Sequence, residues 1–263
     1  MADVGFLGAG AIAAAMVAGL AGDGHRIRVA SRGGASAEAL AAAHPKTRAL
    51  SNAAVVAESE ILFLCLPPAA ARPGLAGLPF RADHRIVSVM LGVSCAELAA
   101  ICAPASEISI AIPLPMIAKG GCPLPVHPPS PALDALFGAR NLILPLENEA
   151  SLAPHFAVTA LCSTTLDQMR AGAGWLARAT GDARAAEAYV TAMLAGALAA
   201  LETDGAARID AALDALSIEG GLNATLRAHM RARGAVEALE QGLDGFRGRL
   251  GMPEAPALKD RRT

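Results

Sequence analysis

The apolar positions along the chain follow two patterns, and the change between them falls near residue 148. In the first part, short continuous apolar runs alternate with helix-length segments, and the clearest runs cover residues 61–66 and 85–91. Such runs, ended by proline or glycine, are typical of parallel strands buried on both faces. Strands separated by helices predict an α/β fold with a doubly wound parallel sheet in residues 1–148. Further strands are expected at residues 4–7, 26–30, 48–50, 107–112 and 142–146.

From residue 149 onward the strand pattern disappears, and the sequence predicts an all-helical domain over residues 149–263. The run 188–201 has almost no polar face, so other helices of this chain or of a partner must enclose it. We therefore expect a homodimer or a higher assembly built on this domain. A loose, polar tail is expected from about Gly251. The expected helices cover residues 153–172, 185–202, 208–216, 224–233 and 235–250.

The first expected strand runs directly into a glycine turn and an alanine-rich helix. G-x-G-x-x-A between a strand and a helix is the pattern of a dinucleotide site, where the helix N-terminus faces a pyrophosphate. Gly8 lets the chain turn sharply, and Gly10, which has no Cβ, lets a phosphate approach the backbone. Cofactor contacts are therefore expected from Gly8, Ala9, Gly10, Ala11 and Ile12.

The end of the second expected strand, Ser31-Arg32-Gly33-Gly34, decides between the two nicotinamide cofactors. Domains that bind NAD usually place an acid here to hold the ribose 2′-hydroxyl, but no acid lies between Val29 and Gly34. Ser31 and Arg32 offer a hydroxyl and a guanidinium, which suit the 2′-phosphate of NADP(H). The alternative is that Arg32 is an ordinary solvated loop arginine.

Other loops are expected beside the same site, because ligands of doubly wound sheets bind beyond the carboxyl ends of the strands. These loops cover residues 66–69, 92–94 and 113–117, and the first places Leu66 and Pro67 among the cofactor contacts. The proline-rich segment 121–131 is expected to be a loop over the surface.

Composition and charge exclude several other classes of protein. The net charge is −2, so the chain lacks the basic excess that nucleic-acid binding needs. The six histidines lack the spacing of a zinc motif, and no metal is expected. The five cysteines show no C-x-x-C spacing, which favours reduced thiols in a cytoplasmic protein. A strand begins almost at Met1, so we expect no signal peptide, and the most apolar run is too short for a membrane helix.

Segments along nearly the whole chain resemble the pyrroline-5-carboxylate reductase family. The turn at residues 5–13 resembles its cofactor motif, and residues 87–94 resemble a strand and Gly-Val-Ser turn of that family. Residues 218–223 stand where the family has Ser-Pro-Gly-Gly-Thr-Thr. The resemblance implies a Rossmann domain, a helical dimerisation domain and NADPH-dependent reduction of a cyclic imine, the reaction type of proline biosynthesis.

The sequence departs from this family at polar positions. Leu66 replaces the lysine of its Lys-Pro, Leu114 replaces the asparagine of its Met-Pro-Asn, and Asn223 replaces the second threonine of its Gly-Gly-Thr-Thr. Residues 162–166 replace its Ser-Gly-Ser-Gly-Pro. Two alternatives therefore stand beside the family reaction: a reductase of a different imine or ketone, and a dinucleotide-binding homologue that has lost catalysis and serves as a sensor.

Candidate substrate contacts lie in the helical part. Gly220 and Gly221 would present backbone amides to a substrate carboxylate, and Asn223 would donate a hydrogen bond near the reacting bond, as the candidate catalytic residue. The alternative is a glycine helix cap with Asn223 in the next first turn. Ser163 and Thr164 are expected to line a polar pocket, unless their hydroxyls bond locally to the backbone.

The distribution of lysines favours an imine over the substrates of the hydroxy-acid reductases. Related two-domain reductases of hydroxy acids use a lysine of the helical domain as an acid. Here Lys46 and Lys119 lie in the α/β half, and Lys259 lies in the tail. A protonated imine accepts a hydride without a strong acid nearby, so the sequence predicts an NADP-dependent oxidoreductase that acts on a C=N bond.

Overall fold

The computed structural model describes residues 1–31, 35–201 and 208–254. The chain divides into two compact units, Met1–Phe156 and Ala157–Thr263, each of which is considered by itself. The boundary expected from the sequence lies between residues 148 and 149, shortly before this division. Most of the expected tail lies outside the described residues.

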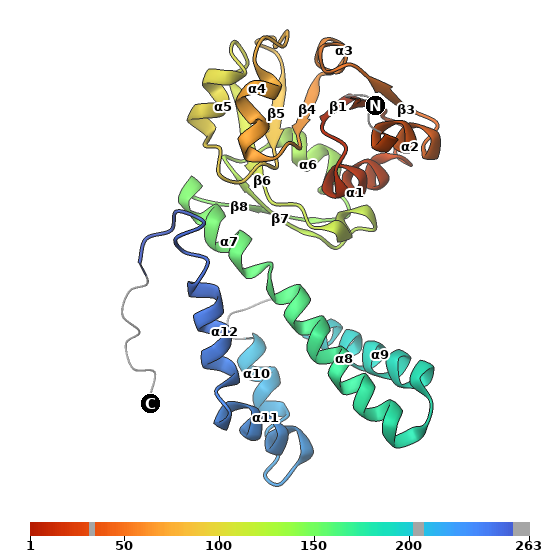
Figure 1. Cartoon of the computed structure of the whole chain (residues 1–263), viewed down its shortest axis with the longest axis vertical. Coiled ribbons are helices and arrows are strands. Elements are labelled where there is room, and N and C mark those ends of the chain that lie inside the picture. Colours follow the sequence, from red (N-terminus) through yellow and green to blue (C-terminus); the bar gives the residue numbers. More distant parts are fainter. Residues whose placement is uncertain (32–34, 202–207, 255–263) are drawn as a thin grey trace. The chain divides into compact units, whose positions relative to one another are not determined.

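The described part of Met1–Phe156 contains an eight-stranded sheet of order β3-β2-β1-β4-β5-β6-β7-β8 (Figure 1). Neighbouring strands are parallel except for β6 and β7, so the expected doubly wound parallel sheet is confirmed. The strand order reverses between β1 and β4, which is where such a sheet opens to ligands. The strands are β1 (Asp3–Leu7), β2 (Arg26–Ala30), β3 (Thr47–Leu50), β4 (Ile61–Leu64), β5 (Arg85–Ser88), β6 (Glu107–Ala111), β7 (Pro123–His127) and β8 (Leu142–Pro145).

Helices cover both faces of the sheet, because alternate residues of each strand point to opposite faces. Val4 and Phe6 belong to one core cluster, with α1, α2 and α6, whereas Leu7 belongs to the other, with α3, α4 and α5. The helices are α1 (Ala11–Leu20), α2 (Ala35–Ala43), α3 (Asn52–Ala57), α4 (Ala71–Leu75), α5 (Cys95–Ile101), α6 (Pro131–Phe137) and α7 (Leu152–Val158), with short 3₁₀ turns η1 (Pro68–Ala70), η2 (Pro115–Ala118) and η3 (Glu149–Ser151).

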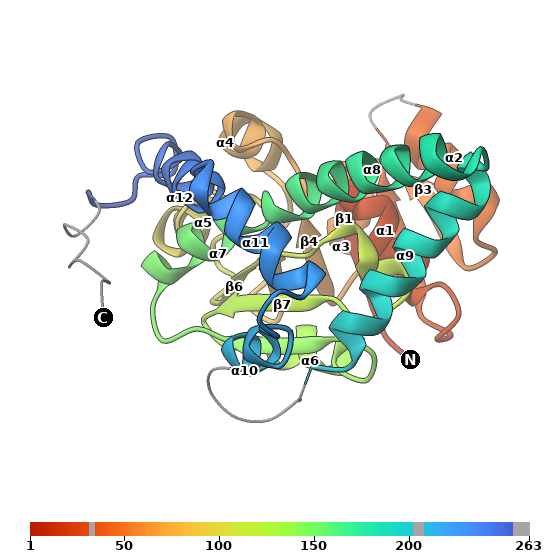
Figure 2. The ribbon, with the colours of Figure 1, turned by 90° about the horizontal axis from the view of Figure 1, so that it is seen from below.

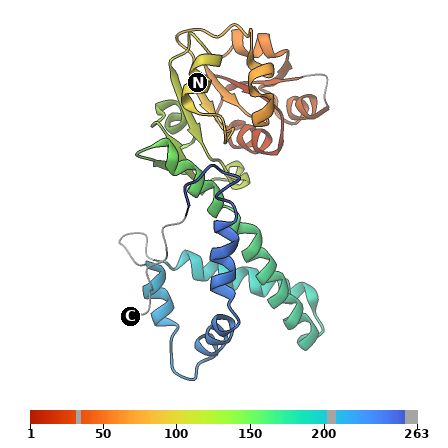
Figure 3. The ribbon, with the colours of Figure 1, turned by 60° about the vertical axis from the view of Figure 1, so that its left-hand side comes forward.

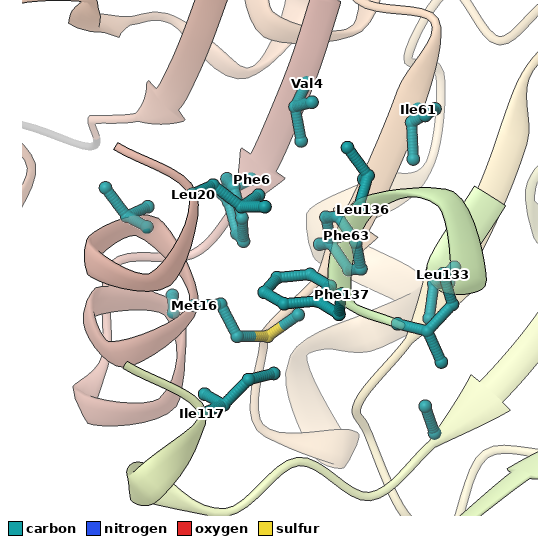
Figure 4. Close-up of a cluster of buried hydrophobic side chains, with 14 of the residues drawn as sticks. Val4, Phe6, Met16, Leu20, Ile61, Phe63, Ile117, Leu133, Leu136 and Phe137 are labelled. Carbon is teal, nitrogen blue, oxygen red and sulfur yellow. The ribbon is translucent and has the colours of Figure 1, made fainter. Parts of the chain in front are cut away.

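Phe63 of β4 lies at the centre of the first cluster (Figure 4). The ring of Phe6 stacks on it with centroids 4.9 Å apart, and the ring of Phe137 from α6 meets it edge-on at 5.9 Å. Figure 4 shows Met16 of α1 and Ile117 of η2 beside Phe137. Because the three rings come from β1, β4 and α6, they join the middle of the sheet to the helices of this face.

Strand β7 corrects the prediction of a surface loop at residues 121–131. Pro123 and Pro125 suggested a loop, because proline cannot donate a hydrogen bond within a sheet. In the structure, β7 pairs with β8 through residues on either side of the prolines: Cys122 accepts from Leu142, and Val126 accepts from Leu146. The register with β6 covers Val126 and His127, and Pro125 takes part through its carbonyl oxygen, which accepts a hydrogen bond from Ile112 N at 3.0 Å.

Ion pairs join β1 to β2 near the first residues of both strands. The carboxylate of Asp3 on β1 accepts hydrogen bonds from Arg26 Nε at 2.6 Å and from Arg28 Nη1 at 2.7 Å. The hydrogen bond from Arg26, helped by the second arginine, lowers the pKa of Asp3 to about 2. The carboxylate is therefore ionised at neutral pH and ties β1 to β2 where both strands begin.

The unit Ala157–Thr263 is helical in its described part. Helices α8 and α9 lie side by side (Figures 1 and 2), and the chain reverses between them at Gly181, whose φ is +78°. Asp182 caps α9 by accepting a hydrogen bond from Ala185 N at 2.9 Å. Helices α11 and α12 meet at a sharp bend at Gly234 (Figure 3). The helices are α8 (Leu161–Thr180), α9 (Ala183–Ala199), α10 (Arg208–Ala215), α11 (Leu222–Ala232) and α12 (Ala235–Asp244).

The predicted helices 153–172 and 235–250 differ in extent from the observed ones. The segment 153–172 is two helices, because a turn closed by Ala160 N and Ala157 O separates α7 from α8. Helix α8 then continues through Gly172 to Thr180. A glycine inside a helix costs about 1 kcal/mol, which packing of α8 against α9 offsets. Helix α12 ends at Asp244 rather than at residue 250.

Helix α9 is mostly exposed within this chain. Ala186 and Val190 are buried, whereas Tyr189 is 62% and Leu198 is 67% exposed. The expectation was that helices of this chain or of a partner enclose residues 188–201, and the described helices of this chain leave much of the run exposed. In the part of the chain that the structure describes, no helix is both long enough and apolar enough to span a membrane.

The aromatic cluster leads to a stability prediction. Replacing Phe63 by alanine leaves a cavity between the Phe6 and Phe137 rings, and it should lower the free energy of unfolding by about 3–5 kcal/mol. Leu142→Ala in β8, where the leucine is 61% exposed, is the control and should cost less than about 1 kcal/mol. Denaturant unfolding followed by far-ultraviolet circular dichroism measures both, and equal losses would contradict the central position of Phe63.

Candidate functional site

A hollow of about 370 Å³ opens where the strand order of the sheet reverses. Its walls come from the turn after β1, the end of β2, the starts of α2 and α3, and the loop after β4. Five of the expected cofactor contacts therefore lie together: Gly8, Ala9, Gly10, Ser31 and Leu66. The remaining lining residues are Ala30, Ser36, Ala37 and Asn52.

The turn after β1 requires glycine at its first position. Gly8 has φ +121°, and a Cβ added to it would lie 2.3 Å from the carbonyl oxygen of Cys65. Cys65 in turn donates its backbone N–H to Leu7 O at 2.9 Å, which holds the two chain segments at this spacing. A side chain at residue 8 would therefore meet both an unfavourable φ and a backbone atom.

The start of α1 has the properties of an anion site. Its N-cap residue, Gly10, makes no side-chain hydrogen bond, and its first turn contains no acid. By contrast, serine side chains cap α3, α5 and α6. A Cβ on Gly10 would meet nothing within 4 Å, so the space in front of the helix is open. The helix dipole and this open backbone suit the pyrophosphate of a dinucleotide.

The other expected cofactor residues differ in position. Ala11 and Ile12 are the first two residues of α1, so their backbone N–H groups belong to the start of the helix. Pro67 is exposed and precedes η1. Arg32 lies outside the described residues.

Sequence reasoning missed Ser36, Ala37 and Asn52. Asn52 carried a usable signal, because it follows Ser51, and a serine before an apolar helical run predicts a helix start at the end of β3. Ser36 and Ala37 lie in the first turn of α2, just beyond residues 31–34, where the cofactor contacts of this loop were expected.

An acid also lies next to the end of β2, although none occurs in the loop itself. The hydroxyl of Ser31 donates a hydrogen bond to Glu38 Oε1 at 2.5 Å, from the first turn of α2. This hydrogen bond lowers the pKa of Glu38, so the carboxylate is ionised at neutral pH. Residues 29–34 contain no acid, so the sequence at the end of β2 does not reveal the carboxylate that the following helix supplies.

The cysteines of the α/β unit do not supply a nucleophile. Burial raises the pKa of Cys65 to about 12, and burial with the nearby Glu149 carboxylate raises that of Cys95 to about 11. Both are thiols at neutral pH, and a thiol reacts far more slowly than a thiolate. In the described ranges, no group of three or more His, Cys, Asp and Glu side chains is arranged to hold a metal ion.

In the helical unit, the 218–223 segment forms a glycine cap. Gly220 has φ +72°, and the amide of Gly221 donates to Ile218 O at 2.9 Å. The amide of Gly221 is therefore engaged within the chain, whereas the expectation gave it to a substrate carboxylate. The contact with a substrate stays a prediction. Asn223 lies exposed in the first turn of α11.

The expected polar pocket around Ser163 and Thr164 has a local explanation. Both hydroxyls donate to the carbonyl oxygen of Ala160 at 3.2 Å, which is the common behaviour of such residues in a first helical turn. Thr164 also lines a groove between α8 and α12. The described lining of this groove does not include Gly220, Gly221 or Asn223.

The sheet order, the glycine turn and the uncapped α1 define a Rossmann-like unit, here followed by a helical unit. In agreement, residues 3–92 match the family described as NADP oxidoreductase, coenzyme F420-dependent. None of the curated proteins matches this chain significantly.

Solved structures identify the fold of the whole chain as that of pyrroline-5-carboxylate reductases. The enzyme from Coxiella burnetii superposes with a TM-score of 0.77 at 17% identity, covering 95% of this chain and 97% of that one. The Plasmodium falciparum pyrroline carboxylate reductase with NADP bound gives 0.76 at 11% identity, covering 95% and 97%. A reductive aminase from Aspergillus terreus in complex with NADPH gives 0.56 at 19%, covering 96% and 88%.

The two glycines of the turn should have separable effects. Gly8→Ala should lower the free energy of unfolding by about 2–4 kcal/mol, because of its φ and the Cys65 carbonyl. Gly10→Ala should cost no more than about 1 kcal/mol, since its Cβ meets no protein atom, yet it should weaken dinucleotide binding at least about 10-fold by filling the space for phosphate. Chemical denaturation and nucleotide titration measure the two effects, and wild-type affinity in Gly10→Ala would contradict the placement of the phosphate.

Proposed function

We propose that this protein is an NADPH-dependent reductase of a cyclic imine, similar to pyrroline-5-carboxylate reductase. The observation that carries the proposal is the hollow at the switch point of the sheet, which has a glycine turn and an uncapped helix N-terminus. The fold of the whole chain supports it. Two of the compared structures, the Plasmodium falciparum reductase with NADP bound and the Aspergillus terreus reductive aminase in complex with NADPH, support the choice of cofactor.

Each part of the hollow has a role in this proposal. The backbone from Gly8 to Ile12 binds the pyrophosphate, and Ser31 with Arg32 holds the phosphate-bearing ribose. Leu66 and Pro67 contact the cofactor from the loop after β4. When bound, the nicotinamide supplies the hydride, and the protein orients it against the substrate.

The substrate half of the proposal uses the segment at the start of α11. Asn223 is exposed, so its side-chain amide is available to donate a hydrogen bond near the reacting C=N bond. Gly220 has open space at the position of a Cβ, which allows a substrate carboxylate to approach the backbone. Ser163 and Thr164 contribute hydroxyl oxygens as acceptors while they donate to Ala160 O.

We also infer that the functional form contains at least two copies of the chain. Helices α8 and α9 border a groove of about 410 Å³ whose lining includes Trp175, Tyr189 and Met193. These three side chains are 66%, 62% and 48% exposed, an extensive apolar surface for a soluble monomer. A second copy that supplies its own α8–α9 surface would cover this groove, as the isologous interface of a twofold dimer does.

Two alternatives have observations in their favour. The local hydrogen bonds of Ser163, Thr164 and Gly221 favour a dinucleotide-binding homologue that has lost catalysis and serves as a sensor. The reductive aminase similarity favours a reductase of a different imine or ketone. Oxidation of NADPH separates them: turnover of pyrroline-5-carboxylate or another cyclic imine supports the proposal, and tight binding without turnover on any imine or ketone supports the sensor.

The proposed role of Asn223 gives a kinetic prediction. Asn223→Ala should lower kcat/KM for the imine about 10- to 100-fold, because it removes a hydrogen bond to the reacting group, while NADPH affinity stays at the wild-type value. Gln241→Ala, which removes another exposed side-chain amide of the helical unit, is the matched control and should leave both quantities unchanged. Full activity in Asn223→Ala would remove this residue from the site.

The proposed assembly gives a second prediction. Sedimentation at micromolar concentration should show a mass at least twice that of one chain, because a second copy buries the apolar groove. Trp175→Lys should shift this equilibrium toward monomer, whereas Arg184→Gln at the exposed start of α9 should not. A wild-type protein that sediments as a monomer would rule out the assembly.

A further inference from the structure

Glu38 reaches the end of β2 from the first turn of α2, close to the place where an acid of the second strand normally selects the cofactor. Its carboxylate lies 2.5 Å from the hydroxyl oxygen of Ser31, and Ser31 lines the hollow. The acid comes from the first turn of α2 rather than from the loop after β2. The described lining of the hollow does not include Glu38 itself, so the carboxylate is linked to the hollow through Ser31. A carboxylate at the end of β2 is the type of group that binds a free 2′-hydroxyl.

This contact has opposite consequences for the two nicotinamide cofactors. A serine hydroxyl carries one hydrogen, so a hydroxyl that donates to Glu38 does not donate to a phosphate at the same time. The negative carboxylate also repels a 2′-phosphate that lies against Ser31. A ribose with a free 2′-hydroxyl avoids the repulsion, because that hydroxyl can donate a hydrogen bond to the carboxylate.

Glu38 also has a structural role in α2, and this role predicts a different result when Glu38 is replaced. An acid in the first turn of a helix interacts favourably with the helix dipole, and Glu38 has this position in α2. A purely structural role affects the stability of the protein and treats both cofactors alike. Selectivity between the cofactors therefore distinguishes the two roles.

We propose that Glu38 sets the nucleotide selectivity of the hollow by opposing the 2′-phosphate, so that the site binds NADH as well as NADPH. The inference rests on the proposed dinucleotide function. Ser31 and Arg32 favour NADPH over NADH, and the carboxylate of Glu38 reduces this difference in affinity. The side chain of Glu38 is exposed, so its replacement removes the charge without opening a cavity.

The test compares the dissociation constants of NADPH and NADH for the wild-type protein and Glu38→Gln at low ionic strength. Glu38→Gln should bind NADPH about 3- to 10-fold more tightly, because a repulsive charge is removed while the side chain keeps its size. NADH affinity should stay constant or fall slightly. Glu107→Gln is the matched control: Glu107 is exposed at the first residue of β6, which is separated from β1 by β4 and β5, and its replacement should change neither constant.

Each outcome bears on a separate claim. If both cofactors bind and Glu38→Gln leaves the ratio of their dissociation constants at the wild-type value, the selectivity role is wrong and the proposed function stands. A change in thermal midpoint with an unchanged ratio identifies the structural role alone, and it also overturns the inference. If the wild-type protein binds neither cofactor, the proposed function fails and the inference fails with it.

Discussion

The close approach of two backbones after β1 and β4 determines both the core and the site. Residues Phe6 and Phe63 are register partners on these strands, and their stacked rings form the centre of one core cluster. Two residues beyond Phe6, the space beside the Cys65 carbonyl admits glycine alone at residue 8. The same strand pair therefore buries the largest side chains of the sheet and directs the start of α1 beyond its edge, where an anion can bind.

The helical unit depends on a different balance of interactions. Its helices are rich in alanine, and small side chains bury little area within one chain. Leu166, Trp175 and Leu198 remain more than half exposed. An apolar helix that stays exposed in one chain is stabilised when a partner covers it, so the proposed dimer would couple the stability of this unit to association.

The sheet was largely predictable from the sequence, because its strands are apolar runs with clear ends. Strand β7 was not, since its prolines are tolerated through the hydrogen bonds of the residues on either side of them, and these bonds depend on the positions of β6 and β8. The glycine turn and Ser31 were predictable as a local motif. Glu38 was not, because its proximity to Ser31 depends on the direction of α2. The extent of α8 likewise depends on α9, against which it packs.

The protonated thiols of the α/β unit have a consequence for chemistry outside the site. Cys65 beside the glycine turn and Cys102 of the second core cluster both have a pKa of about 12, because burial opposes the thiolate. Electrophiles and peroxides react with thiolates, so this unit resists alkylation and oxidation at neutral pH. Cys162, which is exposed on α8, is the accessible thiol of the helical unit. A maleimide dye would therefore label the helices and leave the nucleotide hollow unmodified.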